Sequence, residues 1–117
     1  MDKKHQNNQN VDKKEVINLA ETYAKAVKEK FGKARVILFG SYAKGNYNKD
    51  SDIDIAVILK DYEYLNETQL DLMRLRRNID SRIEPHPFRE KDFNINNPIV
   101  NEILEFGHII TPQRALS

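Results

Sequence analysis

Two short segments constrain the fold of this chain most. The first, residues 34–39, is apolar at nearly every position, which predicts a strand covered on both faces. It ends at Gly40 and Ser41, and after ten further residues a second segment, predicted as a strand over residues 52–59, begins with two aspartates. The sequence therefore predicts two strands associated with a glycine-containing turn and a pair of acids.

The two acids, Asp52 and Asp54, lie two positions apart. Side chains two apart in a strand share a face, so both carboxylates point one way while Ile53 and Ile55 point into a core. Neighbouring carboxylates repel each other unless a hard cation lies between them. Mg²⁺ suits this arrangement because it takes oxygen ligands and usually binds through one or two carboxylates plus substrate phosphates. The pair therefore predicts a site for one or two Mg²⁺ ions.

The turn after the first strand supplies the second half of such a site. Glycine lets a phosphate approach the main chain closely, so Gly40 and the backbone around Ser41 are predicted to bind phosphates. Lys44, in a short helical turn predicted for residues 42–45, is a candidate contact of the triphosphate, and a solvent-exposed lysine is an equally good interpretation. Carboxylates and phosphate turn together indicate phosphoryl or nucleotidyl transfer.

A third carboxylate is expected, because two dications plus a nucleoside triphosphate need more than two negative ligands. Alternation in the segment 81–87 places Arg82, Glu84 and His86 on one face of a predicted strand, so Glu84 is a candidate third ligand. Because prolines lack an amide hydrogen, this strand either lies at an edge of the sheet or ends its pairing at the prolines. Asp80 lies an even number of positions from Glu84, so its side chain would project from the same face of the strand. It is the competing candidate for the third ligand. His86 is either a general base or a histidine packed between two prolines, and the second interpretation is favoured.

These motifs resemble those of a known family. The Gly-Ser pair at 40–41, followed after ten residues by the Asp-Ile-Asp triplet at 52–54, resembles the signature of the DNA polymerase beta-like nucleotidyltransferase superfamily. The longer segments 40–45 and 51–55 are similar to those of the minimal nucleotidyltransferases (MNT proteins) of bacteria and archaea. The resemblance covers about residues 34–110, agrees with the expected fold, and implies that the third acid is Glu84.

Resemblance to MNT proteins also implies a function. Such proteins pair with an all-helical HEPN toxin, act as its antitoxin, and adenylylate it, typically at tyrosine. The expected chemistry is Mg²⁺-dependent transfer of AMP from ATP to a hydroxyl, and the choice of ATP rests on the resemblance alone. Two alternatives stay open: a non-catalytic antitoxin that neutralises its partner by binding, and a nucleotidyltransferase acting on a small molecule such as an antibiotic.

Length and composition exclude several other classes of protein. A chain of 117 residues is expected to form one domain, here residues 11–111, between a disordered tail at 1–10 and a tail at 112–117. A net charge of +1 argues against a protein that coats nucleic acid. The absence of cysteine excludes disulfides and thiolate metal ligands, and no apolar run is long enough to span a membrane. A cytoplasmic location is the default expectation.

The remaining segments predict the rest of the fold. Apolar side chains at helical spacing predict helices over residues 12–31, 66–78 and 98–106, and a last short strand is expected at residues 108–110. Tyr23 in the first helix is interpreted as a core residue rather than an acceptor-binding one. The predicted fold class is α/β or α+β, with a small mixed sheet of about four strands packed with helices.

Overall fold

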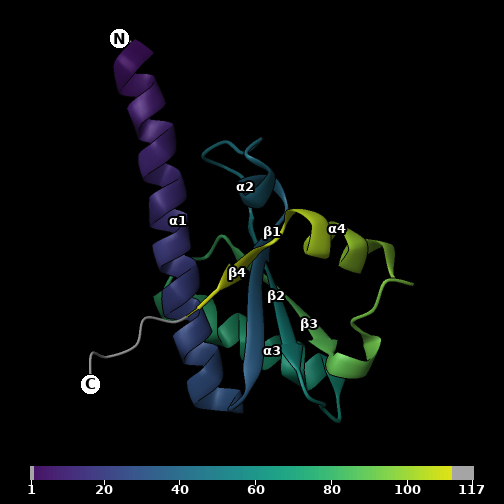
Figure 1. Cartoon of the computed structure of the whole chain (residues 1–117). Coiled ribbons are helices and arrows are strands. Elements are labelled where there is room, and N and C mark those ends of the chain that lie inside the picture. Colours follow the sequence, from purple (N-terminus) through teal and green to yellow (C-terminus); the bar gives the residue numbers. More distant parts are fainter. Residues whose placement is uncertain (1, 112–117) are drawn as a thin grey trace, which may run out of the picture.

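The computed structural model describes the backbone of residues 2–111 and the side chains of residues 13–111. Its elements follow in chain order (Figure 1): α1 (Asp2–Phe31), β1 (Ala34–Phe39), α2 (Ser41–Lys44), β2 (Ile53–Leu59), α3 (Leu65–Leu75), a 3₁₀ turn (Arg76–Asn78), β3 (Ile83–Arg89), a second 3₁₀ turn (Glu90–Asp92), α4 (Pro98–Phe106) and β4 (His108–Ile110). Within the described backbone, no helix is both long and apolar enough to cross a membrane.

The four strands form one mixed sheet in the order β3-β2-β1-β4. β1 pairs with both β2 and β4 in antiparallel fashion, whereas β2 and β3 run parallel. β3 is an edge strand, as its two prolines predict, because a proline has no amide hydrogen for a second neighbouring strand. The predicted mixed α/β fold is confirmed.

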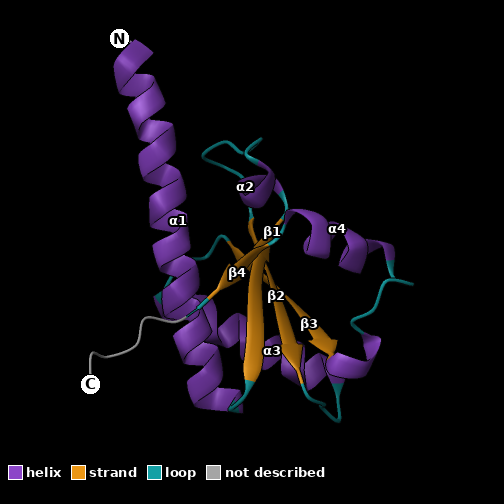
Figure 2. Ribbon diagram, in the orientation of Figure 1, coloured by secondary structure: helices purple, strands orange, loops and turns teal. Residues whose placement is uncertain are grey.

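Helices cover both faces of the sheet (Figure 2). On one face, α1 and α3 pack on the buried side chains of Val36, Leu38 and Ile55. On the other face, Ile103 of α4 packs with Ile37, Phe39, Ala56 and Ile58. The central strand β1 is therefore covered on both sides, which explains why its sequence is nearly continuous in apolar residues.

The start of α1 differs from the sequence prediction. The helix begins at Asp2, whereas a disordered tail was expected at residues 1–10 and a helix start at Asp12. Residues 2–11 contain neither glycine nor proline, so nothing local ends a helix that is nucleated where its later turns pack on the sheet. In Figure 1 the first turns of α1 extend past the sheet. The domain boundary at residue 11 stays a prediction, and the tail expected at 112–117 lies outside the described residues.

Tyr23 is a core residue, as the sequence predicted. Its side chain is fully buried, and its hydroxyl donates a hydrogen bond of 2.7 Å to the carbonyl oxygen of Leu72. Burial raises the pKa of Tyr23 far above the ordinary value for a tyrosine. The hydroxyl thus stays protonated and joins α1 to α3 beneath the sheet.

Tyr23→Phe is expected to lower the free energy of unfolding by about 1 kcal/mol, because it removes one buried hydrogen bond and leaves the Leu72 carbonyl without that donor. Urea unfolding followed by circular dichroism measures the change. Tyr64→Phe is the matched control, since the Tyr64 side chain is exposed, and it should unfold like the wild type. Equal stability of the two variants would contradict a stabilising role for the Tyr23 hydroxyl.

Candidate active site

The predicted acids lie where the end of β1 meets the beginnings of β2 and β3. Asp54 on β2 is the register partner of Phe39 on β1 and of Glu84 on β3. Register partners in a sheet project to the same face, and adjacent strands lie about 4.8 Å apart. Asp54 and Glu84 are therefore neighbours on the face that α4 covers, directly beside the last residue of β1.

Asp52 is exposed and immediately precedes β2. At a strand rise of about 3.3 Å per residue, its Cα lies within roughly 7 Å of the Asp54 Cα. The intervening Ile53, like Ile55, is fully buried in the opposite core. The predicted separation of carboxylates from isoleucines across the sheet is thus confirmed for Asp54, Ile53 and Ile55.

The Asp54 carboxylate is in contact with two other residues of the site. Its Oδ1 atom lies 3.1 Å from Nε2 of His86. Because a carboxylate only accepts hydrogen bonds, the His86 Nε2–H group is the donor. On its other side the carboxylate lies so close to Gly40 that a Cβ atom there would collide with Asp54 Oδ2 and lie 3.1 Å from Cγ.

Gly40 also has a backbone conformation that suits glycine alone. Its φ of 75° and ψ of −149° fall in a region that side chains with a Cβ essentially never occupy. The next residue, Ser41, begins α2, and the amide groups in the first turn of a helix have no acceptor within it. The turn therefore places backbone donors next to the Asp54 carboxylate.

Lys44 contacts α4 in this structure. Its Nζ atom lies 3.0 Å from Oε1 of Glu102, and the ammonium group lies 5.4 Å from the centre of the Phe106 ring. Both members of the ion pair are about one third exposed, at 34% and 37%, so solvent weakens their attraction. A phosphate contact by Lys44 stays a prediction.

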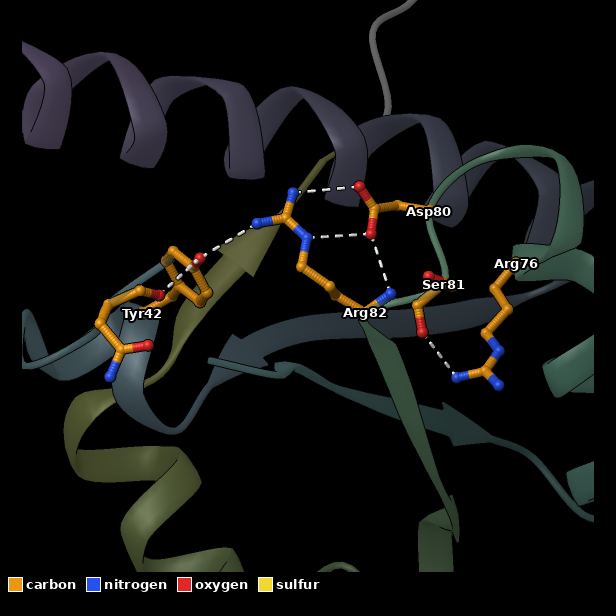
Figure 3. Close-up of polar contacts among 6 residues, drawn as sticks. Tyr42, Arg76, Asp80, Ser81 and Arg82 are labelled. Atoms are coloured by element: carbon orange, nitrogen blue, oxygen red, sulfur yellow. Dashed lines mark hydrogen bonds and ion pairs between the residues drawn. The ribbon is translucent and has the colours of Figure 1, made fainter. Parts of the chain in front are cut away.

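The two candidates for the third acid, Asp80 and Glu84, have different surroundings. Arg82 binds Asp80 through two contacts of 3.0 Å, from Nη2 to Oδ2 and from Nε to Oδ1, and also donates to the Tyr42 hydroxyl at 3.3 Å (Figure 3). These side-chain hydrogen bonds hold the pKa of Asp80 below its ordinary value. Asp80 is thus committed to Arg82, whereas Glu84 is exposed and has no ion pair among the described side chains.

The expectation that Arg82 shares a face with Glu84 and His86 is wrong. β3 begins at Ile83, so Arg82 belongs to the turn before the strand and turns toward Asp80 and Tyr42. Side chains alternate between the two faces only within a strand, so this rule does not give the direction of a side chain in the turn before it. Glu84 and His86, inside β3, keep the predicted relation.

Asp80→Asn is expected to reduce the dependence of stability on acid pH. A carboxyl whose pKa is lower in the folded than in the unfolded state stabilises the fold above its unfolded pKa, about 3.9, and this contribution is lost as the pH falls through the folded value. Urea unfolding at intervals from pH 7 to pH 2 measures the effect. The wild type should lose more stability in acid than Asp80→Asn.

The control for this experiment is Asp50→Asn, at an exposed aspartate that has no ion pair within the part of the chain described. Its profile of stability against pH should follow that of the wild type. Parallel profiles for Asp80→Asn and the wild type would contradict a stabilising role for the Asp80–Arg82 pair.

The three candidate acids carry the oxygen ligands that Mg²⁺ prefers and occupy neighbouring positions in the sheet. Their side chains do not converge on one point in this structure. Among residues 13–111, no three His, Asp or Glu side chains lie close enough to form a metal site. Carboxylates without a cation between them repel one another, which keeps them apart. Asp52, Asp54 and Glu84 nevertheless offer oxygen ligands at neighbouring positions, and substrate phosphates usually complete such a site.

The contact between His86 and Asp54 was not predicted. Strand parity placed His86 on the same face as Glu84, but the register of β3 against β2 was needed to place it beside Asp54. The His86 ring also packs edge-on against Phe39, with ring centres 5.0 Å apart. The favoured interpretation, a histidine packed between two prolines, named neither of these contacts.

Comparison with known proteins identifies relatives over most of the chain. Residues 20–107 match the family described as nucleotidyltransferase domain. Three proteins of Methanocaldococcus jannaschii, provisionally named protein adenylyltransferases, are 33%, 35% and 33% identical to this chain. The matches cover 62%, 86% and 75% of this chain and 74%, 74% and 90% of the relatives.

Solved structures with the same fold come from toxin–antitoxin complexes. One, a toxin–antitoxin crystallised with AMP-PNP, has a TM-score of 0.60 and 23% identity over 80% of this chain and 74% of that one. A second, a variant of the toxin–antitoxin MntA-HpeT, has a TM-score of 0.59 and 22% identity over 78% of this chain and 71% of that one. At this level of identity the two structures support the fold.

Proposed function

We propose, on the premise that this chain belongs to the nucleotidyltransferase domain family, that it transfers AMP from ATP to a hydroxyl group of a partner protein. The chain is a nucleotidyltransferase, as its motifs predicted. The observation that carries the rest of the proposal is the meeting of Gly40, Asp54 and Glu84 at one end of the sheet. A phosphate turn and a pair of adjacent carboxylates are the two parts that nucleotidyl transfer requires.

In this proposal, Asp52, Asp54 and Glu84 hold the divalent ions. Glu84 is preferred to Asp80 because it is the register partner of Asp54, whereas Asp80 is bound by Arg82. When bound, Mg²⁺ would polarise the α-phosphate and favour ionisation of the attacking hydroxyl. The residues of the chain itself fix where the negative charges lie, because β2 and β3 hold Asp54 and Glu84 in register.

The turn at Gly40 and Ser41 binds and orients the phosphates of the donor. Because Gly40 has no side chain, a phosphate can approach the backbone beside Asp54. The acceptor oxygen then forms a bond to the α-phosphorus, the bond from that phosphorus to the β-bridging oxygen breaks, and pyrophosphate leaves. The hydroxyl proton passes to solvent, and the acceptor carries the nucleoside monophosphate.

The proposed acceptor is a tyrosine hydroxyl of a HEPN-type toxin, with this chain as its antitoxin. Two kinds of relative support a toxin protein as the acceptor: those named protein adenylyltransferases, and the toxin–antitoxin complexes that share the fold, one of them with the ATP analogue AMP-PNP. The HEPN type of the toxin and the tyrosine target rest on the resemblance to MNT proteins.

The proposal is tested by incubating the protein with a HEPN toxin co-expressed with it, Mg²⁺, and each nucleoside triphosphate in turn. Intact-mass spectrometry of the toxin should show the addition of one or more AMP groups with ATP alone, and none when EDTA replaces Mg²⁺. A stable complex without any mass increase would favour an antitoxin that acts by binding. Pyrophosphate release that depends on an aminoglycoside would favour a small-molecule transferase.

A further inference from the structure

We infer that His86 is a positioning residue whose hydrogen bond restricts the orientation of the Asp54 carboxylate, a proposed ligand of the divalent metal. The inference rests on the proposed function, which makes Asp54 a metal ligand. It assigns to His86 a hydrogen bond to that ligand rather than contact with the reacting atoms.

The first observation is the contact itself. The His86 Nε2–H group donates to Asp54 Oδ1 over 3.1 Å, and the two side chains are 32% and 26% exposed. A hydrogen bond to an ionised acceptor is stronger than one between neutral groups. A carboxylate has about four acceptor positions, so this bond leaves the remaining ones of Asp54 available to a metal.

The imidazole ring is itself fixed. It packs against Phe39, whose ring centre lies 5.0 Å away and whose side chain is buried. His86 lies between Pro85 and Pro87 in β3, where each proline has a fixed φ and Pro87 also restricts the backbone of the residue before it. The donor atom therefore has a defined position before any ligand binds.

The two oxygens of Asp54 have different surroundings. Oδ1 accepts from His86, and Oδ2 lies against the backbone of Gly40. Rotation of the carboxylate about its Cβ–Cγ bond would break the first contact and change the second. No comparable restraint by an ion pair acts on Asp52 or Glu84 in the described part of the structure. Within that part, Asp54 is thus the member of the proposed set whose orientation is fixed by a neighbour.

A positioning role has a definite consequence for metal affinity. Hydrogen-bond partners of metal ligands orient them, and their loss typically weakens metal binding about 10- to 100-fold. His86→Ala removes the donor, so we expect Mn²⁺, used as the probe, to bind about 10- to 100-fold more weakly. His86→Gln keeps an N–H donor near the position of Nε2 and should recover most of the wild-type affinity.

The experiment measures the dissociation constant of Mn²⁺ from the EPR signal of the free ion, for the wild type, His86→Ala, His86→Gln and Asp54→Asn, without nucleotide or acceptor. Circular dichroism and thermal unfolding check that each variant is folded. The inference predicts weak binding by His86→Ala and near-normal binding by His86→Gln. The Mg²⁺ concentration that gives half the maximal rate of nucleotide transfer should be raised for His86→Ala and close to the wild-type value for His86→Gln.

Failures of the inference and of the proposed function differ in this experiment. If His86→Ala binds Mn²⁺ as tightly as the wild type while Asp54→Asn does not, the positioning role is overturned and the metal site stands. If a folded His86→Gln is as weak as His86→Ala, the ring and not its hydrogen bond is needed, and the positioning role is also overturned. If Asp54→Asn binds like the wild type, the metal site itself is wrong.

Discussion

The combined substitution of Asp52→Asn and Asp54→Asn is expected to lower the rate of nucleotidyl transfer on the order of 1,000-fold, equivalent to about 4 kcal/mol of transition-state stabilisation. Both changes preserve side-chain shape and remove a negative charge that the proposed Mg²⁺ ions require. The amide oxygen that Asp54→Asn introduces still accepts a hydrogen bond, so His86 keeps a partner.

The fold should survive this double change. Asp52 is exposed, and Asp54 is held by one hydrogen bond rather than by a buried ion pair with Lys or Arg. Removing two neighbouring negative charges also relieves their repulsion. We therefore expect the free energy of unfolding to stay equal or to rise slightly, as urea unfolding would show.

The measurement is the rate of mass increase of the HEPN toxin with ATP and Mg²⁺, together with pyrophosphate release. Asp50→Asn is a matched control, because this exposed aspartate lies in the loop just before the pair, and it should transfer at the wild-type rate. A double variant as active as the wild type would exclude the proposed roles of both aspartates. A double variant that is inactive but still neutralises the toxin would show that binding alone is sufficient for the antitoxin effect.

Gly40→Ala is the single substitution expected to damage both fold and activity. The backbone of Gly40, at φ 75° and ψ −149°, costs a residue with a Cβ about 1–3 kcal/mol, and the added methyl group collides with the Asp54 carboxylate. Relief of that collision would displace Asp54 from His86. We expect a loss of about 2–4 kcal/mol in the free energy of unfolding and a loss of transfer on the order of 100-fold.

A close control separates backbone strain from the collision. Gly45, at φ 86° and ψ 5°, also has a positive φ, but a Cβ there would have no atom within 4 Å. Gly45→Ala should therefore cost only about 1–2 kcal/mol and leave the transfer rate unchanged. Equal effects of the two glycine substitutions on stability and activity would show that the contact between Gly40 and Asp54 has no special role.

A double-mutant cycle tests the contact directly. In an Asp54→Ala background the carboxylate that Gly40→Ala would strike is gone, so the cost of Gly40→Ala should fall toward the strain of the backbone alone. The coupling free energy of the cycle, from urea unfolding of the four proteins, measures the collision. If the costs of Gly40→Ala and Asp54→Ala in unfolding free energy are additive, the collision contributes nothing and the cost of Gly40→Ala comes from the backbone conformation of residue 40 alone.

The sequence by itself determined the local features of this protein. The bounds of β1, the start of β2 within one residue and the start of α4 at Pro98 follow from apolar runs and a helix cap, in which the Asn97 side chain accepts from the Ile99 amide at 3.1 Å. The alternation around Asp54 also follows from the chain alone, because strand parity depends only on neighbouring residues. Motif spacing was enough to identify the nucleotidyltransferase family.

Only the tertiary structure decided which distant side chains meet. The register of β3 against β2 places Glu84 beside Asp54 and His86 in contact with it, although His86 follows Asp54 by 32 residues in the chain. Packing of α4 on the sheet gives Lys44 a partner in Glu102, 58 residues further along the chain. These pairings depend on how whole helices and strands pack together. That packing is set by the burial of apolar surface from distant parts of the chain, so no local sequence pattern contains the information.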